Sequence, residues 1–525
     1  MEQEIIVRIL SDPSFYPHKP DHVEVIQTHI SWILIAGEEV YKIKKAVNFG
    51  FLDFSTLEKR KFYCGEEVRL NCRLAPQIYL GVVNISLNEE GKLVMGGAVE
   101  KIVEYAVRMK KIPTENMLKN LLLKPAFDRL ILDRLAQKIV RFHEKAETGG
   151  KIDGIGGWET VCFNQEENFT QTEHFRGITI SSAKHRFIRA SVCRFLKENE
   201  ALFRHRVNSH RIRDCHGDLH LEHIVVAGDD IIIFDCIEFN ERIRYGDIAT
   251  DVSFLAMDLD FHGYGALSEF FVHLYREKSG DGEIMLLLPF YQCYYAFVRG
   301  KVTGFQLNDP NITAAKKEEA TRLAAKYFTL ACSYASRLHE PMLIIMAGLM
   351  GSGKSVIARE LAEITEACVI QMDSLRKEML HIDPAERHFE NFGQGIYDRN
   401  ITQKVYQKSF DQAEKMLAEG KSVIIDASFA KRDHRRAAKD VAKRLNIPFL
   451  ILECVCPDEK IRKRLRQRIK NKDEISDGHL EIFAAQKDDF EVLSECQPGE
   501  RLVLDTSESK DETVEKTIAA IFALP

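Results

Sequence analysis

Residues 343–355 read LIIMAGLMGSGKS, and this stretch decides the fold of the C-terminal part of the chain. Its first five apolar residues predict a strand buried on both faces, as in a parallel sheet. The glycines and the Lys-Ser pair that follow match the pattern GxxxxGK followed by Ser or Thr, whose backbone N–H groups surround nucleotide phosphates. In such a loop the lysine reaches the β and γ phosphates, and the serine hydroxyl ligates Mg²⁺. The predicted nucleotide-binding residues are Gly348, Gly351, Ser352, Gly353, Lys354 and Ser355.

The pattern of hydrophobic residues changes at Pro341. After this residue, apolar strands alternate with amphipathic helices in the order typical of a doubly wound α/β fold. The strands read LIIMAG, CVIQMD, SVIIDA and FLILECV. We therefore predict an α/β domain with a doubly wound parallel sheet over residues 341–525.

Three side chains are expected at the carboxyl edge of this sheet, where doubly wound folds bind ligands. Asp373 is expected to end the strand CVIQMD and to activate an acceptor hydroxyl, with a helix N-cap as the alternative. Arg376 would hold the acceptor or its phosphate. Asp426 ends SVIIDA and is predicted to order Mg²⁺ through water, again with capping as the alternative.

A basic amphipathic helix is predicted over residues 460–472. Arg464 and Arg468 stand one turn apart on it, so they could close over a phosphoryl group during transfer and neutralise its charge. A solvated surface and a nucleic-acid-binding face are the alternatives for this helix.

These motifs resemble the small P-loop kinases that include chloramphenicol phosphotransferase, the zeta-toxin kinases and polynucleotide kinase. The resemblance covers residues 342–525 and rests on GLMGSGKS, MDSLRKEM, VIIDASF and RKRLRQR. It implies that Asp373 is the acceptor-side base and that Arg464 and Arg468 form a lid. Acceptors differ within this group, so the resemblance implies a reaction and no substrate.

The preceding 340 residues read as a second domain, with a small β-rich lobe over about 1–110 and a helical lobe over about 111–340. Short strands with alternating faces are predicted over residues 23–45, and a helix follows over 55–74. The rest of these 340 residues shows mostly helical patterns, apart from a strand-rich island around 214–240. This pattern predicts a two-lobed α+β domain with a cleft between its lobes.

A second candidate phosphoryl-transfer site combines HGDLH, ending at His220, with the strand and carboxylate of IIIFD. Asp218 would accept a proton from a hydroxyl, and Asp235 would hold Mg²⁺ against the ATP phosphates. Asp247 and Asp251 are expected to anchor the loop of Asp218 through hydrogen bonds.

These residues resemble the aminoglycoside phosphotransferase family of the protein-kinase-like fold, over roughly residues 20–335. The resemblance implies a phosphate-binding lysine in the strand VYKIKK, best matched by Lys42, with Lys44 on the same face as the alternative. It also implies that Glu67 pairs with this lysine.

The same resemblance implies two further contacts with ATP. The strand pair across residues 29–31, including Ser31, would cover the phosphates, although this turn lacks the glycines that allow a close approach. The backbone near residues 104–109 would meet adenine.

One departure concerns the metal site. The family normally has Asn five residues after the catalytic Asp, and here that position is His223, a softer ligand than Mg²⁺ prefers. Either His223 binds the metal, or Glu222 or Glu238 takes over. This departure leaves room for a domain that binds nucleotide without efficient transfer.

The charge composition limits which partners the chain can attract as a whole. The 525 residues contain 79 acidic and 73 basic side chains, a net charge of −6, so the chain offers no general attraction to nucleic acid or to an anionic membrane. Its apolar runs are far shorter than the ~20 residues of a membrane-spanning helix, and we see no signal peptide. We expect a cytoplasmic protein.

The first hypothesis is a bifunctional, ATP- and Mg²⁺-dependent phosphotransferase, in which each domain phosphorylates a hydroxyl of a small molecule. A second hypothesis is a P-loop kinase regulated by a nucleotide-sensing, catalytically weak N-terminal domain. A third is a nucleic-acid end kinase. The sequence leaves both acceptors and the oligomeric state open.

Overall fold

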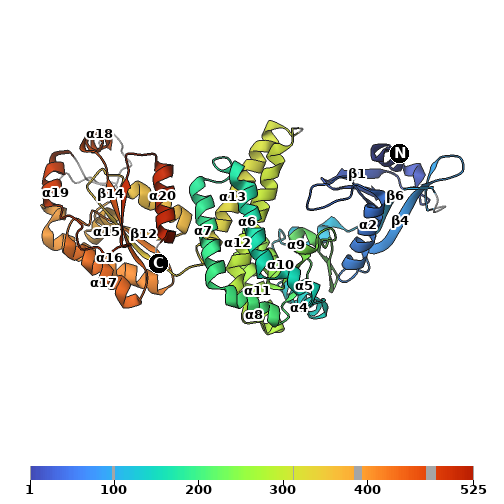
Figure 1. The fold of residues 1–525 in the computed structure, drawn as a ribbon, viewed down its shortest axis with the longest axis horizontal. Coiled ribbons are helices and arrows are strands. Elements are labelled where there is room, and N and C mark those ends of the chain that lie inside the picture. Colours follow the sequence, from blue (N-terminus) through green and yellow to red (C-terminus); the bar gives the residue numbers. More distant parts are fainter. Residues whose placement is uncertain (1, 97–100, 311, 384–392, 469–479, 524–525) are drawn as a thin grey trace. The chain divides into compact units, whose positions relative to one another are not determined.

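The computed structural model describes residues 2–96, 101–310, 312–383, 393–468 and 480–523 (Figure 1). The chain forms two compact units, Met1–Asn164 with Asn199–Tyr295, and Gln165–Glu198 with Ala296–Pro525. The predicted fold class, a kinase-like α+β part followed by a parallel α/β part, is confirmed. The predicted boundary between residues 340 and 341 stays a proposal, because the second unit also holds the earlier helices α7 (Ser182–Glu198) and α13 (Ala314–Ala335).

The small lobe of the first unit is a six-stranded antiparallel sheet. Tyr41 and Ile43 of its third strand pack with helix α1 (Gln3–Leu10), whereas Lys42 and Lys44 point to the opposite face, towards α2 (Leu57–Asn71). This alternation follows from the two-residue period of a strand. The strands, in sheet order, are β1 (Val23–Gln27), β2 (Ser31–Ala36), β3 (Glu39–Lys44), β6 (Ile102–Lys110), β4 (Tyr79–Leu87) and β5 (Leu93–Met95).

The expected adenine contact near residues 104–109 stays a prediction. These residues lie in β6, which pairs with β3 on one side and with β4 on the other. Ladder pairing on both sides covers residues 106–109, and the segment that links the sheet to the helices begins after Lys110.

The remainder of the first unit is mostly helical, with a strand island as predicted. The hairpin of β8 (Ile224–Ala227) and β9 (Asp230–Ile233) ends two residues before Asp235. The short strands β7 (Ile212–Asp214) and β10 (Tyr245–Asp247) pair antiparallel. Helices pack around this island through apolar side chains that recur every three or four residues. These helices are α4 (Leu130–Lys145), α8 (Glu200–Asn208), α10 (Ala249–Phe261), α11 (Gly265–Ser279) and the start of α12 (Ile284–Phe305).

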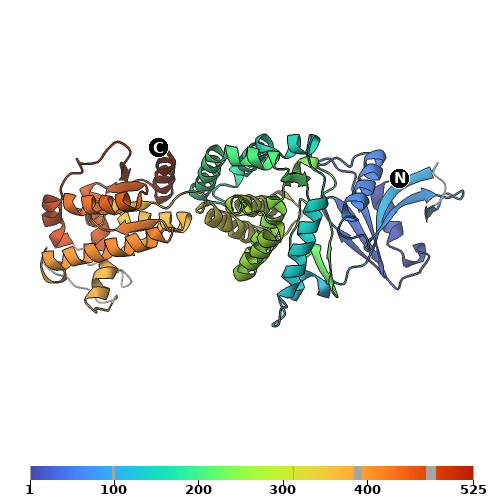
Figure 2. The ribbon, with the colours of Figure 1, turned by 90° about the horizontal axis from the view of Figure 1, so that it is seen from below.

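The second unit contains a five-stranded parallel sheet with helices on both faces (Figure 2). Leu343 and Ile345 pack towards α16 (Arg399–Ala418) and α17 (Arg432–Leu445), and α14 (Lys354–Thr365) packs against α20 (Lys510–Ala523). The strands, in sheet order, are β12 (Cys368–Gln371), β13 (Val423–Asp426), β11 (Leu343–Ala347), β14 (Phe449–Val455) and β15 (Arg501–Asp505). The predicted doubly wound arrangement is therefore confirmed.

Two element boundaries bear on the site. Asp373 does not end β12 but lies in the first turn of α15 (Met372–Met379), which corrects the prediction. The basic helix is α18 (Asp458–Arg468), and the predicted remainder up to residue 472 lies outside the described residues. In the part of the chain that the structure describes, no helix has the length and apolar character needed to cross a bilayer.

Candidate active sites

Lys42 joins the small lobe to the predicted metal-binding carboxylate. Its Nζ lies 2.9 Å from Oε1 of Glu67 and 2.7 Å from Oδ1 of Asp235, a residue 193 positions away in the sequence. Asp235 adopts a left-handed backbone conformation with φ +63°, and its N–H donates to the hydroxyl of Tyr79 at 3.3 Å. Burial opposes ionisation of Asp235, but Lys42 and His223 outweigh this effect and hold its pKa below the ordinary value. Asp235 is therefore a carboxylate that faces a fixed cation.

Lys44 has a different environment, although it lies on the same face of β3. Its side chain is 1% exposed, its Nζ lies 2.6 Å from Oε2 of Glu67, and it also bonds Glu238. Glu238 is therefore engaged by a lysine, while Glu222 pairs with Lys119 and is half exposed. The geometry favours Lys42 as the nucleotide-facing lysine, because it bonds Asp235 and is less buried than Lys44.

We predict that Lys44→Met mainly lowers stability, whereas Lys42→Met mainly weakens nucleotide binding. Lys44→Met leaves the buried Glu238 without its lysine and leaves Glu67 with Lys42 alone, so the free energy of unfolding should fall by about 3–5 kcal/mol. Lys42→Met should weaken binding of an ATP analogue to the N-terminal half with a smaller loss of stability, because Glu67 keeps Lys44. Urea unfolding and nucleotide titration of both variants measure the two effects, and equal loss of stability in both would contradict this assignment.

The loop of Asp218 is anchored through its backbone. Oδ2 and Oδ1 of Asp251 accept hydrogen bonds from the N–H groups of His216 and Gly217, both at 2.9 Å. Burial disfavours the charged form of Asp218, but His220 and His223 outweigh this and lower its pKa to about 2. The carboxylate is therefore ionised at neutral pH.

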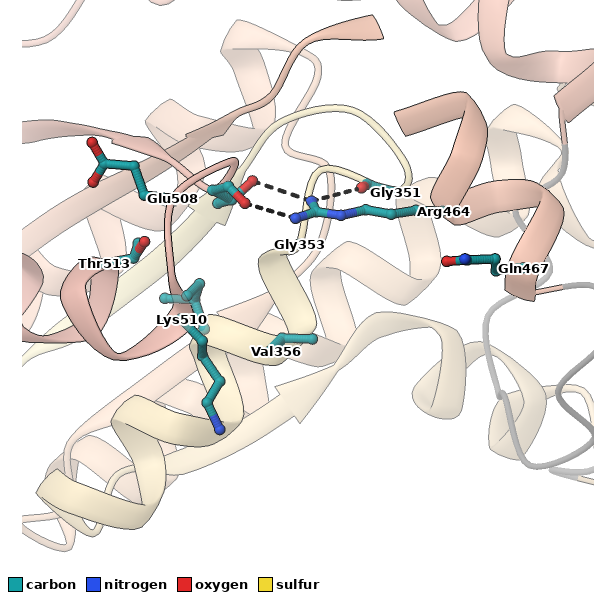
Figure 3. Close-up of a pocket in the computed structure, with 10 residues that line it drawn as sticks. Gly351, Gly353, Val356, Arg464, Gln467, Glu508, Lys510 and Thr513 are labelled. Atoms are coloured by element: carbon teal, nitrogen blue, oxygen red, sulfur yellow. Dashed lines mark hydrogen bonds between the residues drawn. The ribbon is translucent and has the colours of Figure 1, made fainter. Parts of the chain in front are cut away.

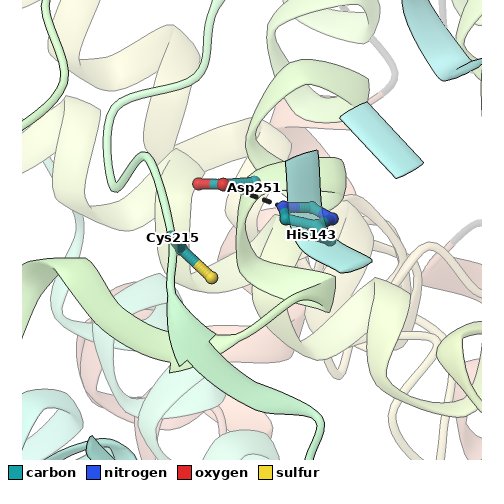
Figure 4. A group of neighbouring side chains, drawn as sticks. All are labelled: His143, Cys215 and Asp251. Carbon is teal, nitrogen blue, oxygen red and sulfur yellow. Dashed lines mark hydrogen bonds and ion pairs between the residues drawn. The ribbon is translucent and has the colours of Figure 1, made fainter. Parts of the chain in front are cut away.

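A buried cluster behind this loop holds Asp251 in place (Figure 4). Nε2 of His143 lies 3.1 Å from Oδ2 of Asp251, and Nδ1 lies 2.8 Å from the hydroxyl of Tyr275. Burial raises the pKa of the neighbouring Cys215 thiol. Asp251 therefore anchors the loop as expected, and sequence reasoning missed its partner His143.

Asp247 does not join this anchor, contrary to expectation. Both its oxygens bond the guanidinium of Arg206, at 2.8 and 2.7 Å, and Oδ1 also accepts from the N–H of Ala249. Asp247 therefore ties α8 to the start of α10.

Ser31 begins β2, and its side chain is buried. Its N–H donates to Oγ1 of Thr28 at 2.9 Å, and its C=O accepts from the N–H of Thr28. A contact between Ser31 and a nucleotide would have to come through its hydroxyl, and this role stays a prediction.

The loop after β11 has the conformation that its glycines require. Gly348 has φ +135°, and a Cβ there would lie 2.4 Å from the carbonyl oxygen of Cys454. Nζ of Lys354 donates to the C=O of Leu349 at 2.8 Å. The lysine therefore reaches across the loop that it follows.

Ser355 and Asp426 meet beside this loop. Burial raises the pKa of Asp426, against the opposing effects of a hydrogen bond with Ser355 and the charge of Lys354. A hydroxyl and a carboxylate side by side are the hard oxygen ligands that Mg²⁺ prefers, so these residues fit that cation.

Asp373 and Arg376 form an ion pair on α15, with 3.0 Å between Oδ1 and Nη1. The guanidinium also lies 4.3 Å from the centre of the Tyr397 ring. Sequence reasoning missed Tyr397, which lies after the undescribed residues 384–392.

Arg464 lines a cavity of about 410 Å³ beside the phosphate-binding loop (Figure 3). Its guanidinium donates to the C=O of Gly351 at 3.4 Å and to the C=O of Thr506 at 2.6 Å. The side chain of Arg468 lies outside the described part of the structure. The opposite wall includes Val356, Lys510 and Thr513. Arg464 is thus fixed against the loop, and the contact with Thr506 was not predicted.

Two family models match separate parts of the chain. Residues 108–285 match the model described as phosphotransferase enzyme family, and residues 343–493 match an AAA domain model. The resemblances predicted for the two halves are confirmed at this level. The class that fold and family matches define is a kinase-type phosphotransferase.

The chain is also similar to individual proteins and solved structures. Uncharacterized proteins of Mycobacterium tuberculosis and Mycobacterium bovis are 29% identical over 484 residues, which is 92% of this chain and 94% of theirs. The GDP and kanamycin complex of APH(2")-IIia is 13% identical, covers 61% of this chain and 98% of its own, and has a TM-score of 0.39. The APS kinase CysC of Mycobacterium tuberculosis is 19% identical, covers 35% of this chain and 98% of its own, and has a TM-score of 0.26.

Proposed function

We propose that this chain is a bifunctional ATP-dependent phosphotransferase, in which each half transfers the γ-phosphate to a hydroxyl of a small molecule. One observation carries the proposal: in each half the charge of a lysine acts on a carboxylate that ends a strand or closely follows one. Lys42 bonds Asp235 at 2.7 Å, and the charge of Lys354 acts on Asp426. This pairing suits phosphoryl transfer, which depends on positioning and charge neutralisation. The cytoplasmic location expected from the sequence is part of the proposal.

In the kinase-like half, Lys42 would hold the ATP phosphates while Glu67 fixes its ammonium group. Asp218 would accept the proton of the acceptor hydroxyl, since it is ionised and held by the anchored loop. A divalent cation, once bound with ATP at Asp235, would neutralise charge on the phosphates.

In the P-loop half, the loop N–H groups and Lys354 would bind the phosphates, with Mg²⁺ held by Ser355 and by Asp426 through water. Asp373 would accept the acceptor proton. Arg376 would bind an anionic or phosphorylated part of the acceptor. Its guanidinium lies 3.0 Å from the Asp373 carboxylate, so it would hold the acceptor next to this base.

The cavity beside the loop would take the base of ATP, with Arg464 as one wall. We predict that Arg464→Ala raises the KM for ATP about tenfold and changes kcat little, because the guanidinium is bonded to Gly351 and Thr506. Arg466→Ala, on the exposed face of α18, is the matched control. A large fall in kcat with unchanged KM would instead favour the lid role expected from the sequence.

The test is transfer of labelled γ-phosphate from ATP into a fractionated metabolite extract, with wild type, Asp218→Asn and Lys354→Ala. We expect two labelled products, each lost in a different variant. A single product lost only with Lys354→Ala would overturn bifunctionality and favour the nucleotide-sensing alternative, which the histidine at position 223 already suggests. Two products that persist in both variants would contradict the assigned sites.

A further inference from the structure

The imidazole of His223 lies between the two carboxylates of the kinase-like site. Its Nδ1 is 2.9 Å from the main-chain oxygen of Asp218, and its Nε2 is 3.6 Å from Oδ2 of Asp235. A carbonyl oxygen can only accept a hydrogen bond, so Nδ1 carries the proton. Nε2 therefore presents its lone pair towards Asp235, which is the tautomer of a histidine that binds metal through Nε2.

The packing around His223 fixes this orientation. Its ring packs against that of His220 at a tilt of 39° with 3.9 Å between centroids, and the ring of Phe234 lies at 5.6 Å. Asp258 accepts a hydrogen bond from the N–H of Leu221, which holds the short helix that carries His223. The lone pair is therefore aimed by the fold.

His220 is oriented for another task. Its Nδ1 accepts the N–H of Glu222 at 3.4 Å, so its proton is on Nε2, which faces Oδ2 of Asp218 at 3.6 Å. It supports Asp218 as a donor and offers no lone pair to a cation there. The candidate ligands are thus one imidazole, from His223, and one carboxylate, from Asp235.

The spacing of these two ligands suits a single ion. Neighbouring ligands of an octahedral cation bound at about 2.1 Å lie about 3 Å apart. The 3.6 Å between Nε2 of His223 and Oδ2 of Asp235 closes to this value with a shift of about 0.6 Å. Residues and spacing therefore fit a nucleotide-bound divalent cation.

The nitrogen ligand changes which cation is favoured. Mg²⁺ prefers oxygen ligands throughout, whereas an imidazole nitrogen raises the affinity for first-row transition metals. We propose that the kinase-like site takes a first-row transition-metal dication in preference to Mg²⁺, with His223 Nε2 and Asp235 as its protein ligands. This proposal rests on the proposed function of the N-terminal half as a nucleotide site.

Mn²⁺ is the probe for this proposal, because its binding and its ligands can be followed by electron paramagnetic resonance. The full chain carries Lys354→Ala to silence the P-loop site, is labelled with ¹⁵N-histidine, and receives Mn²⁺ with an ATP analogue bearing a β,γ-methylene bridge. We expect a ¹⁵N coupling from a directly bound imidazole. His223→Asn, which installs the usual family residue, should abolish the coupling and lower the ratio of Mn²⁺ to Mg²⁺ affinity at least about tenfold.

His273→Asn is the matched control, because His273 is half exposed on α11, and it should keep the coupling. Thermal unfolding of each variant checks that the fold is retained. Nucleotide-dependent Mn²⁺ binding without ¹⁵N coupling, or an affinity ratio unchanged by His223→Asn, would overturn the metal assignment and leave the proposed function standing. No nucleotide-dependent Mn²⁺ binding at all would overturn both.

Discussion

Replacing Lys354 with alanine is expected to reduce phosphoryl transfer by the C-terminal half about 10²–10³-fold. The ammonium group follows the loop whose Gly348 and Gly353 hold positive φ, and it already reaches the carbonyl oxygen of Leu349. Phosphates in that loop would take over this contact, and the lysine charge would then offset the charge that develops in the transition state. Transfer of labelled phosphate under saturating ATP measures the loss in kcat.

Lys415→Ala is the control for this variant, since Lys415 is exposed on α16, and it should leave transfer unchanged. The N-terminal product should also persist in Lys354→Ala. A C-terminal product formed at the wild-type rate by Lys354→Ala would contradict the assignment of the loop.

Asp218→Asn is the second substitution with a large expected effect. The amide keeps the size of the carboxylate and loses its capacity to accept a proton, so N-terminal transfer should fall about 10²–10⁴-fold. Because the pKa of Asp218 is held at about 2, its role as base should persist down to about pH 3 as far as this group is concerned. The rate of formation of the N-terminal product measures this prediction.

Asp229→Asn provides the matched control, because Asp229 is a fully exposed carboxylate paired with Arg134. It should leave both products unchanged. An N-terminal product that survives Asp218→Asn, in a variant that still binds ATP, would remove Asp218 from the catalytic role.

Local patterns predicted most of the C-terminal site. The phosphate-binding loop is one continuous stretch, and its strand and helix follow directly from hydrophobic periodicity. The error at Asp373 concerns a boundary, since β12 ends at Gln371 and the helix begins at Met372. Thr506 could not be predicted, because its contact with Arg464 joins segments 42 residues apart without any local signal.

The N-terminal site depends more on long-range placement. The choice between Lys42 and Lys44 is not visible in the strand pattern, because both lysines lie on one face. The structure separates them by the partners that the loop after β9 supplies, namely Asp235 for Lys42 and Glu238 for Lys44. The placement of residues 104–109 within β6 was not visible for a similar reason, since the pairing of β6 on both sides depends on strands distant in the sequence.

The central claim is that one chain holds two nucleotide sites, one in each half. Equilibrium dialysis with a labelled non-hydrolysable ATP analogue counts them directly. We predict two analogue molecules per wild-type chain, one each in Lys42→Ala and Lys354→Ala, and none in the double variant. A single molecule per wild-type chain, lost with Lys354→Ala and unaffected by Lys42→Ala, would contradict the account.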